Sequence, residues 1–172
     1  SLCSHLCPES AITMVSNRAG DWFLSKSRFG HWFVHARLGI GEENSGKLVS
    51  KVKTETRKLA EQKDIPYILV DGPPGIGCPV ISSFSGIDHV LIITEATQAG
   101  FHDLQRLVDL IQFFKVSASC VINKSDLNEK LVSQIKTYCR KHHIRVINQI
   151  PFHPFFYETL QEGKTLVEGD DH

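Results

Sequence analysis

The chain has 172 residues, with 19 basic and 19 acidic side chains and a formal net charge of zero. This length suits one α/β domain with a sizeable core, and the balanced charge gives no electrostatic case for binding nucleic acid. No signal peptide and no apolar span of membrane-crossing length is visible. The five cysteines form no framework of pairs, which predicts a reducing, cytoplasmic environment. The apolar or helical surroundings of Cys78, Cys120 and Cys139 predict structural roles for these thiols.

Apolar periodicity predicts strands alternating with helices along the chain. Residues 14–32 are consistent with paired short strands. Further strands are expected over 33–38, 67–70, 90–93, 118–122 and 146–150, and helices over about 45–63, 80–84, 100–114, 131–139 and 155–163. Basic and acidic residues alternate on the first long helix, which predicts a solvated helix face. This order predicts an α/β fold with a mostly parallel sheet flanked by helices.

The most informative motif begins where the apolar run 67–70 ends in an acid, Asp71. A stiff turn follows at once, made of Gly72, Pro73, Pro74 and Gly75. Four apolar residues in a row are typical of a strand buried on both faces, and α/β sheets bind ligands at the carboxyl ends of such strands. An acid there can hold the water shell of a nucleotide-bound Mg²⁺, and Gly75 can bring a backbone N–H close to a phosphate. Asp-Gly-Pro is also a common turn, so the motif alone does not decide the function.

A second motif, Asn123-Lys124-Ser125-Asp126, follows the expected strand over 118–122. Asn-Lys-x-Asp after a strand favours recognition of a nucleotide base. The Asn binds the ring edge, the Lys lies along the ring, and the Asp accepts the donors of guanine. The sequence therefore predicts base binding at Asn123, Lys124 and Asp126.

The printed sequence has no complete phosphate-binding loop. The segment 41–48 approaches the pattern G-x-x-x-x-G-K-[ST], but Leu48 replaces the hydroxyl that would bind Mg²⁺. Two glutamates in this segment would also oppose a polyanion. We therefore expect a turn between a strand and a helix, with Asn44 or Ser45 as the helix cap.

In their order, 71–75, 123–126 and Ile150-Pro151-Phe152 resemble the motifs of MinD/ParA/Mrp-type deviant P-loop ATPases. The N-terminus is similar to the branch that carries an inserted ferredoxin domain. There, Cys3, Cys7 and Pro8 match the end of the ferredoxin pattern C-x₂-C-x₂-C-x₃-C-P. Further agreement lies in 35–38, 41–49 and 94–97. The resemblance covers nearly the whole chain.

This resemblance implies how the chain is organised. Family members begin with a strand and a Walker A loop ahead of the ferredoxin insert, so the chain is expected to be the C-terminal part of a longer protein. Residues 1–13 would be a remnant of the insert, 14–32 a connection, and 33–172 part of a P-loop NTPase-like nucleotide-binding domain. Cys3 and Cys7 would be ligands of a 4Fe-4S cluster in the intact protein.

The function implied by the resemblance is that of an ATP-hydrolysing molecular switch that uses Mg²⁺. Asp71 would act in catalysis by organising the metal and its water, and residues 72–75 would sense the γ-phosphate. Asn123 would bind adenine beside a loop that contains Pro151, although His153 stands where the family often has Asp. The intact protein would be a homodimer, with a redox or iron–sulfur protein as a possible partner.

Two other functions remain open from the sequence. The Asn-Lys-Ser-Asp motif also suits a GTP-binding protein, but GTPases pair it with Asp-x-x-Gly, whereas three residues separate Asp71 from Gly75. Without a phosphate loop, the chain could instead be a catalytically inactive fragment or an interaction module.

Overall fold

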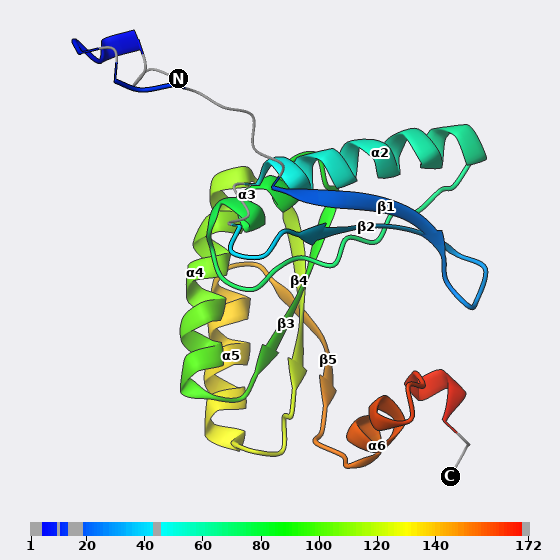
Figure 1. The fold of residues 1–172 in the computed structure, drawn as a ribbon. Coiled ribbons are helices and arrows are strands. Elements are labelled where there is room, and N and C mark those ends of the chain that lie inside the picture. Colours follow the sequence, from blue (N-terminus) through cyan, green and yellow to red (C-terminus); the bar gives the residue numbers. More distant parts are fainter. Residues whose placement is uncertain (1–4, 10, 14–18, 43–45, 170–172) are drawn as a thin grey trace. The chain divides into compact units, whose positions relative to one another are not determined.

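The computed structural model describes residues 5–9, 11–13, 19–42 and 46–169 (Figure 1). The chain divides into two compact units, Ser1–Ser85 and Gly86–His172. Within the described ranges, the first includes a β-hairpin and the helices over 47–63 and 78–84, and the second includes a parallel sheet with its helices. Within the described part of the chain, no helix has the length and apolar character needed to cross a membrane.

The hairpin of the first unit pairs β1 (Gly20–Lys26) with β2 (Trp32–Leu38) in antiparallel register. Gly30 has a φ of 81°, a conformation that favours glycine, and closes the turn by donating its N–H to the carbonyl of Ser27. A pair of short strands was expected within 14–32 and a separate strand over 33–38. The structure has one strand in the first segment, β1, and its partner is the strand predicted separately, so the expected pairing is wrong. β2 does not join a parallel sheet, because its ladder partner is the strand immediately before it.

The long helix α2 (Lys47–Lys63) packs against this hairpin. The ammonium groups of Lys51 and Lys63 lie 5.4 and 5.9 Å from the ring centroids of Trp22 and Trp32. Such cation–π contacts, together with burial of the lysine stems, attach a highly charged helix to a two-stranded sheet. The predicted caps Asn44 and Ser45 lie outside the described residues, and the helix begins after Gly46, whose φ is 83°.

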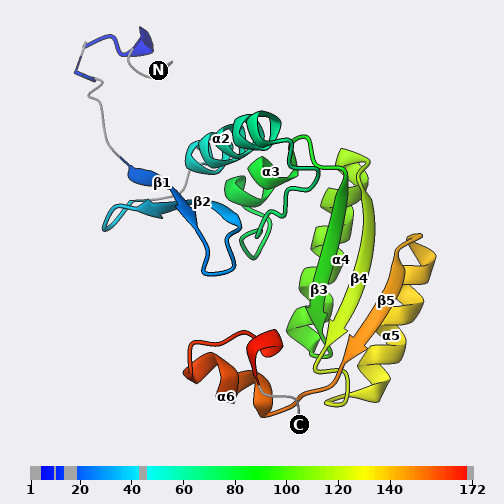
Figure 2. The ribbon, with the colours of Figure 1, turned by 90° about the vertical axis from the view of Figure 1, so that its right-hand side faces the viewer.

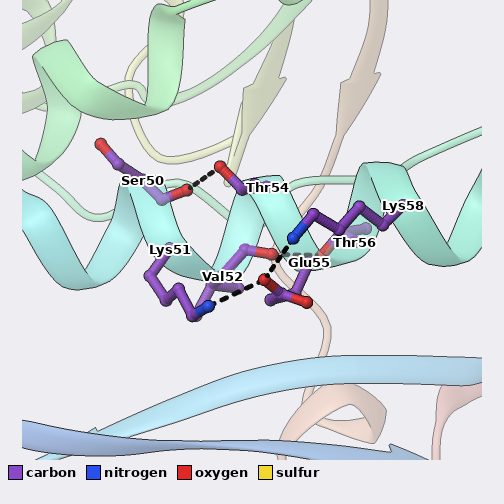
Figure 3. A network of polar contacts seen from close by, with 7 residues as sticks. All are labelled: Ser50, Lys51, Val52, Thr54, Glu55, Thr56 and Lys58. Atoms are coloured by element: carbon purple, nitrogen blue, oxygen red, sulfur yellow. Dashed lines mark hydrogen bonds and ion pairs between the residues drawn. The ribbon is translucent and has the colours of Figure 1, made fainter.

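Charged and hydroxyl side chains along α2 make local contacts within the helix (Figure 3). Glu55 accepts from Lys51 at 2.8 Å and from Lys58 at 3.1 Å, and these hydrogen bonds lower the pKa of its carboxyl. Along the same helix, the hydroxyls of Thr54 and Thr56 donate to backbone carbonyls one turn earlier, those of Ser50 and Val52. These contacts between residues three and four apart satisfy polar groups within the helix, and the Glu55 side chain at their centre is only 18% exposed.

Lys53 differs from these residues because its side chain reaches another helix, the end of the short helix α3 (Cys78–Phe84). Its ammonium group donates to the carbonyl oxygens of Ser82, Ser83 and Ser85 at 3.2, 2.6 and 2.7 Å. Those carbonyls form the C-terminal end of α3, where helical partners are lacking and positive charge is favoured. Desolvation and then the neighbouring Arg57 lower the pKa of Lys53.

The strand predicted over 67–70 is absent, and that prediction is wrong. The segment has no regular secondary structure, and Tyr67 and Leu69 are 87% and 97% exposed. A strand exists only through its ladder hydrogen bonds, and no described strand pairs with this segment. The apolar run shows a preference for a buried strand, but the sequence does not show whether a partner is present.

The second unit is a three-stranded parallel sheet with strand order β3-β4-β5. Its elements are β3 (His89–Glu95), α4 (Gln98–Phe114), β4 (Ser117–Asn123), α5 (Glu129–Lys141), β5 (Arg145–Ile150), α6 (Phe155–Gln161) and a 3₁₀ turn at Leu166–Glu168. Each predicted helix and strand after residue 78 is present within a few residues. The expected α/β fold, with a parallel sheet flanked by helices, is confirmed.

Helices α4 and α5 cover the same face of the sheet (Figures 1 and 2). The core therefore lies between β4 and these two helices. Its members are Ile92, Leu104, Val108, Ile111, Cys120, Ile122, Leu131, Val132, Ile135 and Cys139. The alternation of side chains along a strand places Leu91 and Ile93 on the opposite face, where both are exposed.

We predict that Lys53→Met destabilises the first unit by about 1 kcal/mol. The lysine supplies charged hydrogen bonds to three helix-end carbonyls, and partial solvent exposure reduces what these bonds contribute. Thermal and urea unfolding of the whole chain would measure the change. The matched control is Lys58→Met on the same helix, where loss of an exposed ion pair should change the free energy of unfolding by less than about 0.5 kcal/mol. Equal effects of the two variants would contradict the role of Lys53.

Candidate functional site

The segment 71–75 is an exposed loop of the first unit. Asp71 is exposed and does not end a strand, because the predicted strand before it is absent. Gly75 has a φ of 89°, and a Cβ built on it would meet no atom within 4 Å. The glycine is therefore required by backbone conformation, and the space around it is open.

The Asn123–Asp126 turn lies in the second unit at the carboxyl end of β4. The side-chain oxygen of Asn123 accepts the N–H of Lys124 at 3.0 Å, and Lys124 has a φ of 50°. This local hydrogen bond supports a left-handed conformation that a lysine rarely adopts. The N–H of Ser125 donates to the carbonyl of Ile150 at 3.0 Å, which ties the turn to the end of β5.

A second tie connects the turn to the loop after β5. Asp126 Oδ1 accepts the N–H of Phe152 at 2.7 Å, across 26 residues of sequence. A charged acceptor makes this a strong hydrogen bond for an exposed position. Pro151 lies between the two ties and is exposed. The structure thus brings Asn123, Lys124, Asp126 and Pro151 into one corner of the sheet.

The structure adds Glu95 to this group. Glu95 is the last residue of β3 and lies opposite Asn123 in the parallel register. Its carboxylate accepts the Lys124 ammonium at 2.6 Å, with both side chains about two-fifths exposed. This ion pair spans the carboxyl ends of β3 and β4 and holds the lysine in place. Its sequence signal is an acid at the end of a strand, the same signal that singles out Asp71.

The segment that follows Glu95 packs closely against the backbone of β3. The Thr97 hydroxyl accepts the N–H of Gly100 and caps α4, and the Thr94 hydroxyl donates to the Gly100 carbonyl, both at 3.0 Å. A Cβ on Gly100 would lie 2.6 Å from the carbonyl oxygen of Glu95. Glycine is therefore needed here for a close approach of backbone to backbone.

His153 takes a local structural role in the loop after β5. Its Nδ1 accepts the N–H of Phe155 at 3.2 Å, just where α6 begins. No described hydrogen bond links His153 to the Asn123–Asp126 turn. Histidine in place of the family's aspartate at this position therefore leaves both hydrogen bonds that hold the turn, from Ser125 to Ile150 and from Phe152 to Asp126, in place.

The predicted cluster ligands find no support among the described residues. Cys3 lies outside them, and Cys7 has a free, half-buried thiol. No group of three or more histidine, cysteine, aspartate or glutamate side chains in the described ranges could hold a metal ion. A 4Fe-4S cluster takes four thiolates, so the described residues alone do not fit one.

Of the three cysteines predicted to be structural, Cys120 and Cys139 lie in the core. Cys120 and Cys139 are both fully buried, which confirms the prediction that they belong to the core. The hydrogen bond with Cys139, and then burial, raise the pKa of the Cys120 thiol far above its ordinary value. Cys120 is therefore held as a neutral core thiol. Cys78 is exposed at the start of α3.

Comparison with known proteins gives partial matches. No family model matches the chain. The uncharacterised protein MJ0578 of Methanocaldococcus jannaschii is 35% identical over 99 residues, which are 58% of this chain and 34% of the relative. The uncharacterised protein MJ0579 of the same organism is 29% identical over 120 residues, which are 70% of this chain and 43% of the relative. The chain thus spans less than half the length of either relative.

Among solved structures, the MinD cell division protein of Aquifex aeolicus is similar, with a TM-score of 0.61 and 19% sequence identity. The match covers 85% of this chain and 60% of that chain. The chain has a MinD-like fold. The fold expected from the motifs is confirmed, while the ferredoxin branch and the division into 1–13, 14–32 and 33–172 stay predictions.

We predict that Asp126→Ala loosens the corner of the sheet. The Phe152 N–H loses a charged acceptor, which should cost about 1 kcal/mol at this exposed position. Hydrogen exchange at Phe152 should become faster, and urea unfolding should report the lost stability. Asp103→Ala is the control, because Asp103 is an exposed residue of α4 whose contact with Arg106 is 3.7 Å long. Unchanged exchange at Phe152 would show that the hydrogen bond does not order the loop.

Proposed function

We propose that this chain forms the C-terminal part of a MinD-like molecular switch that binds and hydrolyses ATP with Mg²⁺. The observation that carries the proposal is the corner made by Asn123, Lys124 and Asp126 at the carboxyl ends of parallel strands. Ligands of α/β folds bind at this edge. The MinD-like fold supports the proposal at the level of architecture.

The hydrogen bonds of the corner suit it to binding a base. Asn123 uses its side-chain oxygen within the turn, so its amide NH₂ is the group left to donate to a ring nitrogen. Glu95 holds the Lys124 side chain across the strand ends, where its stem can lie along a ring. In this proposal Asn123 recognises the base, and Lys124 and Pro151 line its pocket.

The same geometry favours adenine over guanine. A guanine grip would use both carboxylate oxygens of Asp126 for the two donors of the base. One of these oxygens already accepts the Phe152 N–H at 2.7 Å. Adenine has no such pair of donors, so its binding needs fewer hydrogen bonds from this carboxylate. The Phe152 hydrogen bond uses one of about four lone-pair sites of the carboxylate, so it disfavours guanine without blocking it, and competition between ATP and GTP decides.

The loop 71–75 supplies the second part of the proposal. Mg²⁺–ATP, when bound, supplies the γ-phosphoryl group that water attacks. Asp71 would accept hydrogen bonds from the water shell of the metal. The left-handed Gly75, with open space around it, would present its N–H to a phosphate. The exposure of the segment suits a loop that changes its contacts between nucleotide states.

Further parts of the proposal concern the intact protein. We infer a homodimer that shares its nucleotide sites, and a 4Fe-4S cluster with Cys3 and Cys7 among its ligands. A redox or iron–sulfur protein would then be the partner of the switch. The homodimer rests on the resemblance to the family as a whole, and the cluster and its redox partner rest on the N-terminal motif. A 4Fe-4S cluster needs four thiolates, and the sequence offers two of the ferredoxin type.

We predict that the 172-residue chain alone hydrolyses ATP no faster than buffer. Positioning of the β- and γ-phosphates supplies most of the catalysis in phosphoryl transfer, and this sequence has no complete loop for it. A steady-state phosphate-release assay is the measurement. Turnover that disappears in Asp71→Ala would contradict the prediction and would direct attention to 41–48 as a phosphate loop.

We predict that Asn123→Ala in the intact protein weakens ATP binding by about 1–3 kcal/mol, or roughly five- to a hundred-and-fifty-fold. Titration with a fluorescent ATP analogue measures this, and competition with ATP and GTP tests the base preference. Asn148→Ala is a matched control, because Asn148 also accepts the N–H of the next residue, at 2.8 Å, but lies on β5 away from the turn. If Asn123→Ala binds ATP with unaltered affinity, Asn123 does not bind the base.

A further inference from the structure

Two side chains at the carboxyl ends of β3 and β4 offer complementary hydrogen-bonding groups. Glu95 and Asn123 are direct partners in the parallel register, so both side chains leave the sheet on the same face. Neighbouring strands of a sheet lie about 4.8 Å apart. A single planar ligand at this edge can therefore meet both side chains.

The Asn123 side chain mainly offers donors to a ligand. Its oxygen already accepts the N–H of Lys124 at 3.0 Å, and its NH₂ group has no partner among the described residues. Each N–H of an amide donates one hydrogen bond. The ligand atom that meets this NH₂ group must therefore be an acceptor.

The Glu95 side chain offers the opposite group. One oxygen of its carboxylate accepts the Lys124 ammonium at 2.6 Å, and the structure describes no partner for the other oxygen. An ionised carboxylate accepts hydrogen bonds and donates none. The ligand atom that meets Glu95 must therefore be a donor.

The position of Glu95 is fixed by the start of α4. A Cβ on Gly100 would lie 2.6 Å from the carbonyl oxygen of Glu95, so the two backbones are in close contact. The Thr94 hydroxyl donates to the Gly100 carbonyl at 3.0 Å and strengthens that contact. With its backbone held here and its carboxylate held by Lys124, Glu95 needs little ordering to accept a further hydrogen bond.

We propose that Glu95 selects adenine over guanine, by accepting a hydrogen bond from the 6-amino group while Asn123 donates to the ring nitrogen beside it. Adenine carries this donor next to an acceptor, whereas guanine has the 6-oxo group, an acceptor, in place of the amine. Guanine would bring that oxygen against the carboxylate of Glu95, and such repulsion is an effective means of discrimination. This inference rests on the proposed function, because it assigns a role within the same base-binding corner.

Direct contact with the base differs in its consequences from a role limited to holding Lys124. The lysine stem would lie along the face of the ring, which all purines share. Loss of its support would therefore weaken the binding of every purine nucleotide by a similar factor. Loss of a contact with the 6-amino group changes the ratio between nucleotides that differ at position 6.

This ratio can be measured in the intact protein by displacement of an ATP analogue that carries its fluorophore on the ribose. The competitors are ATP, purine riboside triphosphate and inosine triphosphate, which carry an amine, a hydrogen atom and an oxo group at position 6. ATP should bind about tenfold tighter than purine riboside triphosphate, because the latter lacks a hydrogen bond to a charged group. Inosine triphosphate should bind most weakly, because its oxygen faces the carboxylate.

Two variants of Glu95 test the contact. Glu95→Gln introduces an amide that both donates and accepts, so the affinity for inosine triphosphate relative to ATP should rise at least about fivefold. Glu95→Ala removes the acceptor, so ATP and purine riboside triphosphate should then bind with affinities within about twofold of each other. Circular dichroism of each variant checks that the protein is folded.

Two further variants serve as comparisons. Lys124→Met should weaken the binding of all three nucleotides and leave their ratios unchanged, because Glu95 keeps its carboxylate. Glu162→Gln is the matched control. Glu162 also pairs with a lysine, Lys164, at 2.9 Å, but it lies at the end of α6, so its substitution should change neither affinities nor ratios.

Four outcomes would overturn the assignment of Glu95. If Asn123→Ala weakens ATP binding but Glu95→Gln leaves the ratios unchanged, the base site stands and Glu95 does not select the base. If Lys124→Met changes the ratios as much as Glu95→Gln, Glu95 acts only through the lysine. Tighter binding of inosine triphosphate than of ATP to the unchanged protein would contradict the expected contact. If no nucleotide binds, the proposed function is wrong as well.

Discussion

The register of three parallel strands is the constraint on which the candidate site depends. Because β3, β4 and β5 run in the same direction, their last residues meet at one edge, with Glu95 opposite Asn123 and Asn123 opposite Ile150. The ion pair from Glu95 to Lys124 and the hydrogen bond from Ser125 to Ile150 both follow from that register. A shift of one residue would send these side chains to the other face of the sheet.

Most of the core of the second unit lies on the helix-covered face of the sheet. Helices α4 and α5 bury the central strand, and Cys120 and Ile122 are fully covered. Parallel sheets generally have both faces covered, whereas Leu91, Ile93 and Ile147 remain about half exposed here.

The hairpin of the first unit needs support from another element, because a two-stranded hairpin is only marginally stable in water by itself. Its support is a charged helix that uses lysines in three ways: over tryptophan rings, in ion pairs with Glu55, and as a donor to the end of α3. A sequence pattern of alternating charges indicates only the second of these. The cap formed by Lys53 depends on a helix about thirty residues away in the chain.

The sequence alone determined most of the elements and the identity of the turn residues. Apolar periodicity located β3, β4, β5 and the helices between them, because local pattern and tertiary packing agree there. It also singled out Asn123, Lys124 and Asp126, whose chemistry is local. Tertiary structure decided which elements have partners. The run 67–70 has the composition of a buried strand but no ladder, β2 pairs with its neighbour rather than with a parallel strand, and Glu95 joins the site through register. Strand pairing requires a second segment, which can lie far away in the chain. The β-propensity of one segment therefore does not predict whether it has a partner.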